Sequence, residues 1–296
     1  MNQRDDRTWN VRELLVWTTG YFTERAIETA RLDSEALLAH ALATTRMSLY
    51  LNYECVVADG ALESFRKFIR RRAEREPVAY ITGEKEFYGL PFHVTPAVLV
   101  PRPETEILVE SVVNQLRNTS LRHGCRALDV GTGSGAIAIS FAKELASNDV
   151  AVVATDISEA ALDVARINAD RNGVALRIEF RCGDLLDAVQ SGETFRAVLS
   201  NLPYIPTRDF ASLEPEVSVF EPRLALDGGD DGLELIRRLV DGVPTILESS
   251  GWFALEIGVG QAESVTERIR RTDAFDEPTV IRDYSGVERV VLAQKR

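Results

Sequence analysis

The sequence has few of the side chains that cross-link a fold or hold a metal. Its three cysteines, Cys55, Cys125 and Cys182, lie far apart, and its three histidines are scattered. No group of these residues has the spacing of a metal site, so we expect free, largely buried thiols and no bound metal. Repeats and low-complexity segments are missing as well, which favours ordinary globular domains.

Long apolar runs are also missing. No stretch approaches the roughly 20 apolar residues needed to span a bilayer, and the first ten residues are polar and charged. A secretory signal would need an apolar segment there. We therefore expect a cytoplasmic protein without a membrane partner.

Basic residues are outnumbered by acidic ones. The chain carries 34 Lys and Arg against 46 Asp and Glu, which gives a net charge of −12. Residues 1–85 contain 13 of each sign, so the whole negative excess belongs to the remainder. Because an acidic surface repels a phosphate backbone, the sequence argues against a direct nucleic-acid substrate. The 296 residues can form one large domain or two ordinary ones, and we expect a monomer.

The region over residues 1–80 has a helical pattern. Apolar residues recur there at three- and four-residue steps, as at Phe65, Phe68 and Ile69, which is typical of amphipathic helices. Asp33-Ser34 stands before an apolar run and predicts the start of one helix. The pattern as a whole predicts a small helical domain.

The basic run Arg66–Arg72 in this region has two interpretations. As a solvated helix face it needs no function, which is the common case for such runs. As a docking patch it would contact an acidic protein or an RNA.

Residues 81–105 change in character. Glycine and proline interrupt short β-prone pieces such as Phe92–Val94 and Val98–Val100. This pattern predicts a hairpin linker between two domains. The second domain then covers residues 106–296.

From about residue 125, apolar runs typical of buried strands alternate with helical stretches. The predicted strands are Arg126–Val130, Val150–Thr155, Leu176–Arg181, Phe195–Leu199 and Trp252–Ile257, with β-rich pieces at Thr279–Ile281 and Glu288–Leu292. The predicted helices are Ala136–Ala146, Ser158–Asn172, Gly232–Leu247 and Gln261–Arg271. This alternation predicts an α/β fold with a doubly wound, mostly parallel sheet.

The first predicted strand ends in a glycine-rich turn. Its sequence is Asp129-Val130-Gly131-Thr132-Gly133-Ser134-Gly135. Glycine lets the backbone pass close to a ligand, and ligands in such sheets bind at the carboxyl ends of the strands. The second strand ends in Asp156, whose carboxylate can accept hydrogen bonds from ribose hydroxyls. The pattern predicts a nucleoside cofactor without choosing between NAD and S-adenosylmethionine.

The third predicted strand leads into Asp184 and Leu185. Asp184 can accept a hydrogen bond from an adenine amino group while Leu185 packs on the ring. An Asp at a strand end is equally suited to cap the segment that follows it.

The segment Asn201-Leu202-Pro203-Tyr204 follows the fourth predicted strand. Asn201 offers a carbonyl acceptor and an amide donor, Pro203 fixes the backbone, and Tyr204 offers a flat face. Together they suit a planar group that carries N–H bonds.

These motifs resemble the release factor glutamine methyltransferase family (PrmC, also called HemK) from about residue 77 to the end of the chain. Besides the glycine turn, Asp156 and Asn201–Tyr204, the matching segments are Pro77–Gly83, Phe87–Gly89, Val100–Glu106, Glu221–Leu226, Leu255–Gly258 and Asp283–Gly286. The segment Pro101–Glu106 is the most specific of them. The helical domain and the hairpin also agree with the family.

The resemblance implies a Rossmann-like, class I methyltransferase domain that uses S-adenosylmethionine. The substrate would be the glutamine of the Gly-Gly-Gln loop in peptide chain release factors, the proteins of translation termination, and residues 1–80 would recognise the partner. The implied cofactor-binding residues are Gly131, Thr132, Gly133, Ser134, Gly135, Asp156, Asp184, Leu185 and Asn201. The implied catalytic and substrate-binding residues are Asn201, Leu202, Pro203 and Tyr204, with Arg102 and Glu104 added on the substrate side.

The chemistry of an amide nitrogen fits these residues. Its lone pair is delocalised, so it needs to be held with both N–H bonds engaged and the lone pair aimed at the methyl group. The Asn201 oxygen can accept one N–H, the carbonyl of Leu202 the other, and Tyr204 can pack on the amide plane. Such positioning supplies several kcal/mol. The family usually has proline at position 202, and because Leu202 keeps the carbonyl, we predict a looser but working site.

Three alternatives stay open. Asn-Leu-Pro-Tyr also occurs in ribosomal RNA adenine N6-methyltransferases, where it would hold a flipped adenine, although such enzymes should carry a basic surface. A nicotinamide-dependent dehydrogenase would use the glycine turn but leave Asn201–Tyr204 without a role. A binding module that has lost its chemistry is favoured only by Leu202.

Overall fold

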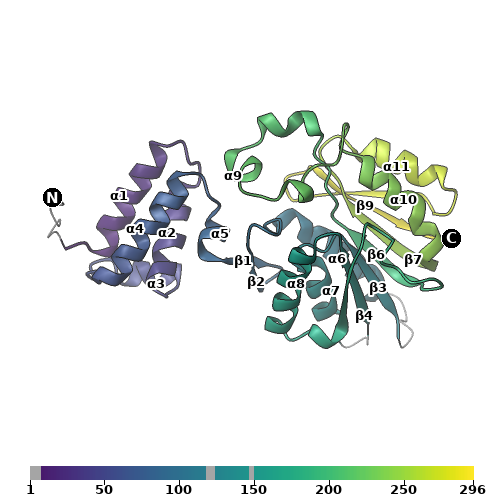
Figure 1. The fold of residues 1–296 in the computed structure, drawn as a ribbon, viewed down its shortest axis with the longest axis horizontal. Coiled ribbons are helices and arrows are strands. Elements are labelled where there is room, and N and C mark those ends of the chain that lie inside the picture. The colour runs from purple at the N-terminus through teal and green to yellow at the C-terminus, as the bar shows by residue number, and fades with distance from the viewer. Residues whose placement is uncertain (1–7, 118–123, 147–149) are drawn as a thin grey trace. The chain divides into compact units, whose positions relative to one another are not determined.

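The computed structural model describes residues 8–117, 124–146 and 150–296. The chain divides into two compact units (Figure 1). The helical unit contains residues 1–83 together with residues 215–220, and the sheet unit contains residues 84–214 and 221–296. The first seven residues of the predicted helical domain lie outside the described residues.

Among the described helices, none combines the length and the apolar character that crossing a membrane requires.

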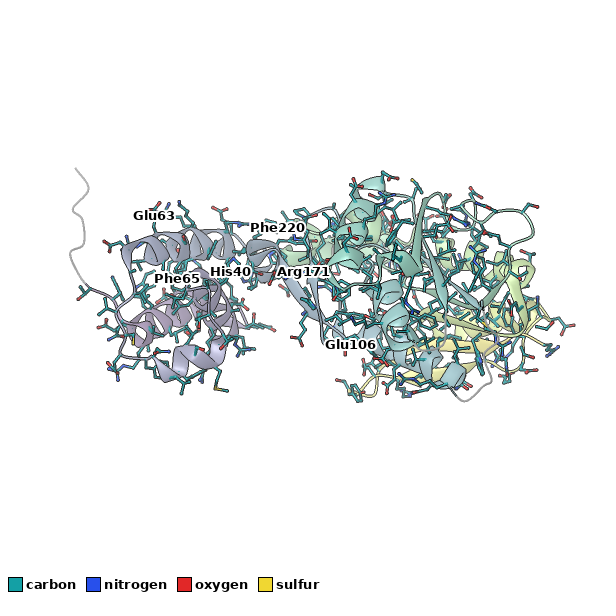
Figure 2. The ribbon with its side chains drawn as sticks, turned by 90° about the horizontal axis from the view of Figure 1, so that it is seen from below. His40, Glu63, Phe65, Glu106, Arg171 and Phe220 are labelled. Carbon is teal, nitrogen blue, oxygen red and sulfur yellow. The ribbon has the colours of Figure 1, made fainter. Side chains whose placement is uncertain are left out.

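The helical unit is built from short amphipathic helices. They are α1 (Val11–Thr23), α2 (Ala30–Ala41), α3 (Arg46–Leu51), α4 (Asp59–Ala73), α5 (Val78–Thr82) and the single turn α9 (Pro215–Ser218). Phe22, Leu37 and Phe65 are fully buried in its core. Figure 2 shows Phe65 between the helices and Glu63 on the outside of α4. The helical pattern over this region is therefore confirmed.

The predicted helix start at Asp33-Ser34 is wrong. Helix α2 begins at Ala30, one turn earlier, and both residues lie inside it and are buried. The Ser34 hydroxyl donates to the Ala30 carbonyl over 2.7 Å, and the Asp33 carboxylate accepts from Arg72 over 2.7 Å. Ser34 therefore bonds to the preceding turn of its own helix, and Asp33 makes a tertiary contact instead of capping a helix.

The basic run Arg66–Arg72 is divided between two environments. Arg66, Lys67 and Arg70 are exposed, as a solvated helix face requires. Arg72, in contrast, is buried and bonded to two carboxylates, Asp33 at 2.7 Å and Glu216 of α9 at 2.8 Å. The last residue of the run thus holds α4, α2 and α9 together within the helical unit.

Loss of the Arg72 charge should destabilise the helical unit. Arg72→Met leaves the buried Asp33 carboxylate without its cation, whereas Glu216 keeps its ion pair with Arg75 over 2.8 Å. Removing one partner of a buried pair costs about 3 kcal/mol. Hydrogen exchange of the α2 and α4 backbone amides measures this loss as faster exchange. The matched control is Arg70→Met on the same helix, where the side chain is exposed and the change should stay below about 0.5 kcal/mol. Equal exchange in the two variants would contradict the prediction.

The predicted hairpin is present, but one of its strands differs from the prediction. Strand β1 (Glu84–Phe87) pairs antiparallel with β2 (Leu90–His93). The two-residue turn between them, Tyr88-Gly89, has positive φ at both residues (54° and 68°), which matches the twist of a hairpin. The piece Val98–Val100 forms no strand; its valines are buried side chains of an irregular segment.

The hairpin is attached to the sheet unit. Phe87 and Phe92 are buried in the same apolar cluster as helices of that unit. The Asn168 side chain also exchanges two hydrogen bonds with the His93 backbone, accepting over 2.6 Å and donating over 2.9 Å. The same Asn168 amide donates to the Ser134 carbonyl over 2.9 Å, so the hairpin is tied to the glycine turn.

The sheet unit contains one seven-stranded, mostly parallel sheet, which confirms the predicted α/β class. Its strands are β3 (Arg126–Val130), β4 (Ala151–Asp156), β5 (Ile178–Cys182), β6 (Phe195–Ser200), β7 (Leu247–Glu256), β8 (Thr279–Arg282) and β9 (Glu288–Gln294), in the order β5-β4-β3-β6-β7-β9-β8. Strand β9 runs antiparallel to both β7 and β8. The order reverses direction between β3 and β6, and ligands bind at the carboxyl ends of strands at such a point.

Helices cover both faces of this sheet (Figure 1). One face carries α6 (Glu106–Arg117), α7 (Ala136–Glu144) and α8 (Glu159–Arg171), and the other carries α10 (Glu234–Ile246) and α11 (Ala262–Arg271). Alternate residues of one strand enter opposite clusters, as Ala127 and Leu128 do. Helix α6 was not predicted from the sequence. Short 3-10 turns complete the unit: η1 (Pro103–Thr105), η3 (Ala175–Arg177), η4 (Thr207–Ser212) and η5 (Arg223–Ala225).

The three cysteines are free thiols, as expected, but two of them are not buried. Cys125 is buried, whereas Cys55 and Cys182 are exposed. Cys182 ends the edge strand β5, where one side of the strand faces solvent.

Candidate active site

A cavity of about 310 Å³ lies at the carboxyl ends of the central strands. Its walls include the glycine turn after β3, Asp156 after β4, Asp184 and Leu185 after β5, and Asn201–Pro203 after β6. The volume falls in the range of small-molecule sites. The structure therefore brings together the two motifs that the sequence placed at separate strand ends.

The glycine turn is shaped by its backbone conformation. Gly131, Gly133 and Gly135 all have positive φ (75°, 54° and 82°), which other residues adopt only with strain. The amides of Gly131 and Thr132 both donate to the Thr155 carbonyl over 2.9 Å, which fixes the turn against β4. A Cβ atom on Gly133 would meet no protein atom within 4 Å, so its backbone is open to a ligand.

Two aspartates hold the turn by accepting hydrogen bonds from it, Asp156 from the backbone and Asp129 from the Thr132 hydroxyl. Asp156 accepts from the Gly133 amide over 2.8 Å and from the Ser158 amide over 2.9 Å. Burial raises its pKa, and these backbone bonds oppose the shift. Asp129 is fully buried, accepts from Thr132 over 2.6 Å and from Ala138 over 3.1 Å, and has its pKa raised to about 7 by burial.

Asp184 lines the cavity with an existing partner. Its carboxylate is 2.7 Å from Arg238 of α10, so an adenine amino group would share this acceptor with the guanidinium. Leu185 also lines the cavity and has an unusual positive φ of 50°. Both residues are half-buried.

Three of the four residues of the segment Asn201–Tyr204 line the cavity, and the fourth contacts a carboxylate behind the cavity wall. Asn201, Leu202 and Pro203 line the cavity. The Tyr204 hydroxyl is instead 3.4 Å from the Glu256 carboxylate at the end of β7, and burial raises the pKa of Tyr204. A Cβ on Gly131 would be 3.1 Å from Leu202 Cδ2, so the Leu202 side chain packs against the glycine turn.

The two predicted charged residues of the segment before α6 have different positions. Arg102 lines the cavity and is 2.6 Å from the buried Glu221. Burial raises the pKa of Glu221, and Arg102 opposes the shift. Glu104 is half-buried and is not among the described residues that line the cavity.

Sequence reasoning missed several residues that support the site. Thr105 lines the cavity and contacts both Asn201 and Glu256. Thr105 and Glu256 lie inside segments that matched the family, but the sequence assigned them no role. Gly228 and Gly232 press against the backbone of the Asn201–Tyr204 segment: a Cβ on Gly228 would be 2.7 Å from the Pro203 carbonyl oxygen. The signal for this contact in the sequence was the three glycines that follow η5, at positions 228, 229 and 232.

Among the described residues, no group of three or more His, Cys, Asp or Glu side chains is arranged to hold a metal ion.

Two family models match the chain. The one described as the PrmC N-terminal domain matches residues 13–83, and the one described as a methyltransferase domain matches residues 127–218.

Curated relatives match over nearly the whole length. The chain is 41% identical over 283 residues to the release factor glutamine methyltransferase of Geobacter sulfurreducens, with 96% of each chain covered. It is 43% identical over 270 residues to the protein of the same name from Moorella thermoacetica, with 91% of this chain and 93% of that one covered.

Among solved structures, the crystal structure of a methyltransferase from Pyrococcus furiosus matches 70% of this chain and 89% of its own, with a TM-score of 0.50 and 21% identity. This likeness shows the fold. Together with the methyltransferase family model, it identifies the sheet unit as a class I methyltransferase fold.

Proposed function

Because the chain belongs to the release factor glutamine methyltransferase family, we propose that it methylates a glutamine side chain of peptide chain release factors. The glutamine is that of the Gly-Gly-Gln loop, and the methyl donor is S-adenosylmethionine. The observation that carries the proposal is the single cavity in which the glycine turn and Asn201 meet. A cofactor held at the turn would face a substrate held at Asn201.

The residues at the turn suit S-adenosylmethionine, which supplies an electrophilic methyl group when it is bound. The open backbone at Gly133 allows close approach of a ligand. Each Asp156 oxygen accepts one backbone hydrogen bond and keeps a lone pair for the ribose hydroxyls. Asp184 and Leu185 would line the adenine end of the cavity, where the carboxylate is already shared with Arg238.

The residues at Asn201 suit a neutral amide. Asn201 Oδ1 accepts one N–H of the glutamine amide and the Leu202 carbonyl accepts the other, which directs the nitrogen lone pair at the methyl group. Both acceptors also favour the positive charge that develops on nitrogen. Holding the reacting atoms in this geometry needs no strong base, because the amide nitrogen becomes acidic only as the new bond forms.

Asp156→Asn should weaken cofactor binding. The substituted amide has one oxygen for two backbone N–H donors, so either Gly133 or Ser158 loses its acceptor. Bonds to a charged group are worth about 1.5–3 kcal/mol, and we expect a Kd for S-adenosylmethionine about 10- to 100-fold higher. Calorimetry measures it. The control is Asp163→Asn on α8, an exposed residue paired with Arg166; equal Kd values in both variants would contradict the assignment.

Mass spectrometry of a release factor tests the function directly. The factor is incubated with S-adenosylmethionine, with and without the protein, and the Gly-Gly-Gln peptide is sequenced. We expect one added methyl group on the glutamine, only when the protein is present. A parallel incubation with ribosomal RNA and labelled cofactor covers the alternative: methyl transfer to RNA and none to the release factor would refute the proposal.

A further inference from the structure

Next to the cavity, polar side chains from separate segments form a chain of hydrogen bonds. The Asn201 Nδ2 amide donates to Thr105 Oγ1 over 3.1 Å, and the Thr105 hydroxyl donates to Glu256 Oε2 over 2.6 Å. The Tyr204 hydroxyl donates to Glu256 Oε1 over 3.4 Å. Thr105 is 5% exposed and Glu256 is 1% exposed, so these bonds are shielded from bulk water.

The number of donor hydrogens in this series of hydrogen bonds determines which way the Asn201 amide faces. An ionised carboxylate can only accept, so the single hydroxyl hydrogen of Thr105 goes to Glu256. The hydroxyl then has only lone pairs left for Asn201, and only the amide nitrogen can meet them. The Asn201 Oδ1 atom is left to face the cavity that Asn201 lines.

We propose that Thr105 and Glu256 are positioning residues that hold the Asn201 amide with its oxygen toward the substrate nitrogen. The inference rests on the proposed function, which gives Asn201 the role of accepting an N–H of the glutamine. An Asn201 amide turned the other way would set its own N–H groups against those of the substrate, and both donors would lose a hydrogen bond. Thr105 and Glu256 act on the reaction through Asn201.

The charge of Glu256 changes close to neutral pH. Burial raises its pKa to about 7, and hydrogen bonds with Thr105 and Tyr204 oppose the shift. The groups that face it are Thr105 and Glu104 from η1, Tyr204 after β6, and Arg289 on β9. When Glu256 is protonated it can donate to Thr105, which releases the hydroxyl hydrogen for Asn201 Oδ1 and allows the amide to turn. The ionised carboxylate therefore fixes the amide orientation above this pH, and below it the orientation is no longer enforced.

Two substitutions at position 105 separate positioning from packing. Thr105→Val keeps the shape and loses the hydroxyl, so kcat for methyl transfer to a release factor should fall about 100-fold. The Kd for S-adenosylmethionine should stay within about threefold, because the Asp156 and Gly133 contacts are untouched. The KM for the factor should rise by less than kcat falls, because the Asn201 acceptor matters most for the charge that develops on nitrogen in the transition state. Thr105→Ser restores the hydroxyl and should bring kcat back to within about threefold of the unsubstituted protein.

The control is Thr266→Val on α11, which removes another buried hydroxyl, bonded to the Ala262 carbonyl. Its kcat should match that of the unsubstituted protein. Equal kcat values for Thr105→Val and Thr105→Ser would overturn the inference.

The pH profile tests the role of Glu256. We expect kcat of the unsubstituted protein to rise with pH through about 7, since the ionised carboxylate fixes the amide. Glu256→Gln cannot ionise, so its kcat should be lower and should show no such rise. A Glu256→Gln profile that keeps the rise at the same midpoint would overturn the inference.

A spectroscopic measurement needs no substrate and no activity. In protein labelled with 15N-asparagine, the Asn201 side-chain NH2 signal, assigned with Asn201→Ala, should shift with a midpoint near pH 7 and should not shift in Glu256→Gln. An unmoved signal in the unsubstituted protein overturns the inference even where methyl transfer is observed. A titrating signal without methyl transfer to any release factor counts against the proposed function alone.

Discussion

Asn201→Ala should lower kcat for methyl transfer to a release factor by about 100- to 1000-fold, the usual cost of removing one group that stabilises the transition state. Asn201 lines the cavity beside the glycine turn and offers the side-chain oxygen to which we assign one N–H of the glutamine amide. Without it, the nitrogen is held by the Leu202 carbonyl alone, and its lone pair is no longer aimed. Steady-state kinetics with a purified release factor measure the loss.

Cofactor binding serves as the internal check on that variant. The resemblance also implies a cofactor contact for Asn201, but the Asp156 and Gly133 contacts are untouched in this variant, so the Kd for S-adenosylmethionine should stay within about threefold. Asn114→Ala on α6, an exposed asparagine of the same unit, is the matched control and should keep full kcat. If Asn201→Ala kept kcat within about threefold of the control, Asn201 would not be the acceptor.

Gly232→Ala should reduce kcat by about as much as Asn201→Ala does, although Gly232 is not among the described residues that line the cavity. Gly232 has φ of 77°, and a Cβ there would collide with the Tyr204 carbonyl oxygen. That oxygen is also held by the Gln261 Nε2 donor at 2.9 Å. Because the obstacle is a backbone atom, the Asn201–Tyr204 segment must move, and a displacement of this kind costs about 100-fold in rate.

Gly260→Ala is a close control for this substitution. Gly260 has φ of 80°, nearly the same backbone conformation, but a Cβ there would meet nothing within 4 Å. Both variants bear the cost of a left-handed alanine, about 1–2 kcal/mol, and both should unfold at a lower temperature. Only Gly232→Ala should lose kcat. Similar kcat values for the two would show that the motif tolerates the shift.

The parts of the fold that repeat a local pattern were predictable from the sequence. The strand Arg126–Val130 was predicted with its exact bounds, and the strands that precede Asp156 and Asn201 within one residue at each end, because apolar residues dominate their sequences. The glycine turn and the distal Asp156 were placed at strand ends, and the structure lines one cavity with them. The roles assigned to these residues stay predictions that the substitutions above test.

Contacts between distant segments are not indicated by any local sequence pattern. Thr105 and Glu256 are separated by 151 positions, and nothing in either local sequence indicates the hydrogen bond between them. The wrong helix start at Asp33 has the same cause. Its local sequence resembles a helix cap, but its partner Arg72 is 39 positions away. Local sequence alone does not distinguish a polar residue that makes a tertiary hydrogen bond from one that caps a helix.

Leu202 has an explanation that its motif did not suggest. Its side chain is 3% exposed, packs against the glycine turn and belongs to the apolar cluster under α10 and α11. A proline at this position would fix the backbone through its ring, whereas leucine is held by burial of its side chain. The carbonyl that we assign to the substrate is therefore anchored through the hydrophobic core.

The ion pairs of Arg72 affect how the protein can be divided into fragments. Because the short segment 215–220 is counted with the helical unit, the chain passes from one unit to the other three times. The N-terminal family model stops at residue 83, and a fragment cut there would leave out Glu216, one of the two carboxylates on the buried guanidinium. To express the helical unit alone, this missing carboxylate has to be supplied. Otherwise Arg72 has to be replaced with an apolar side chain and Asp33 with a neutral one.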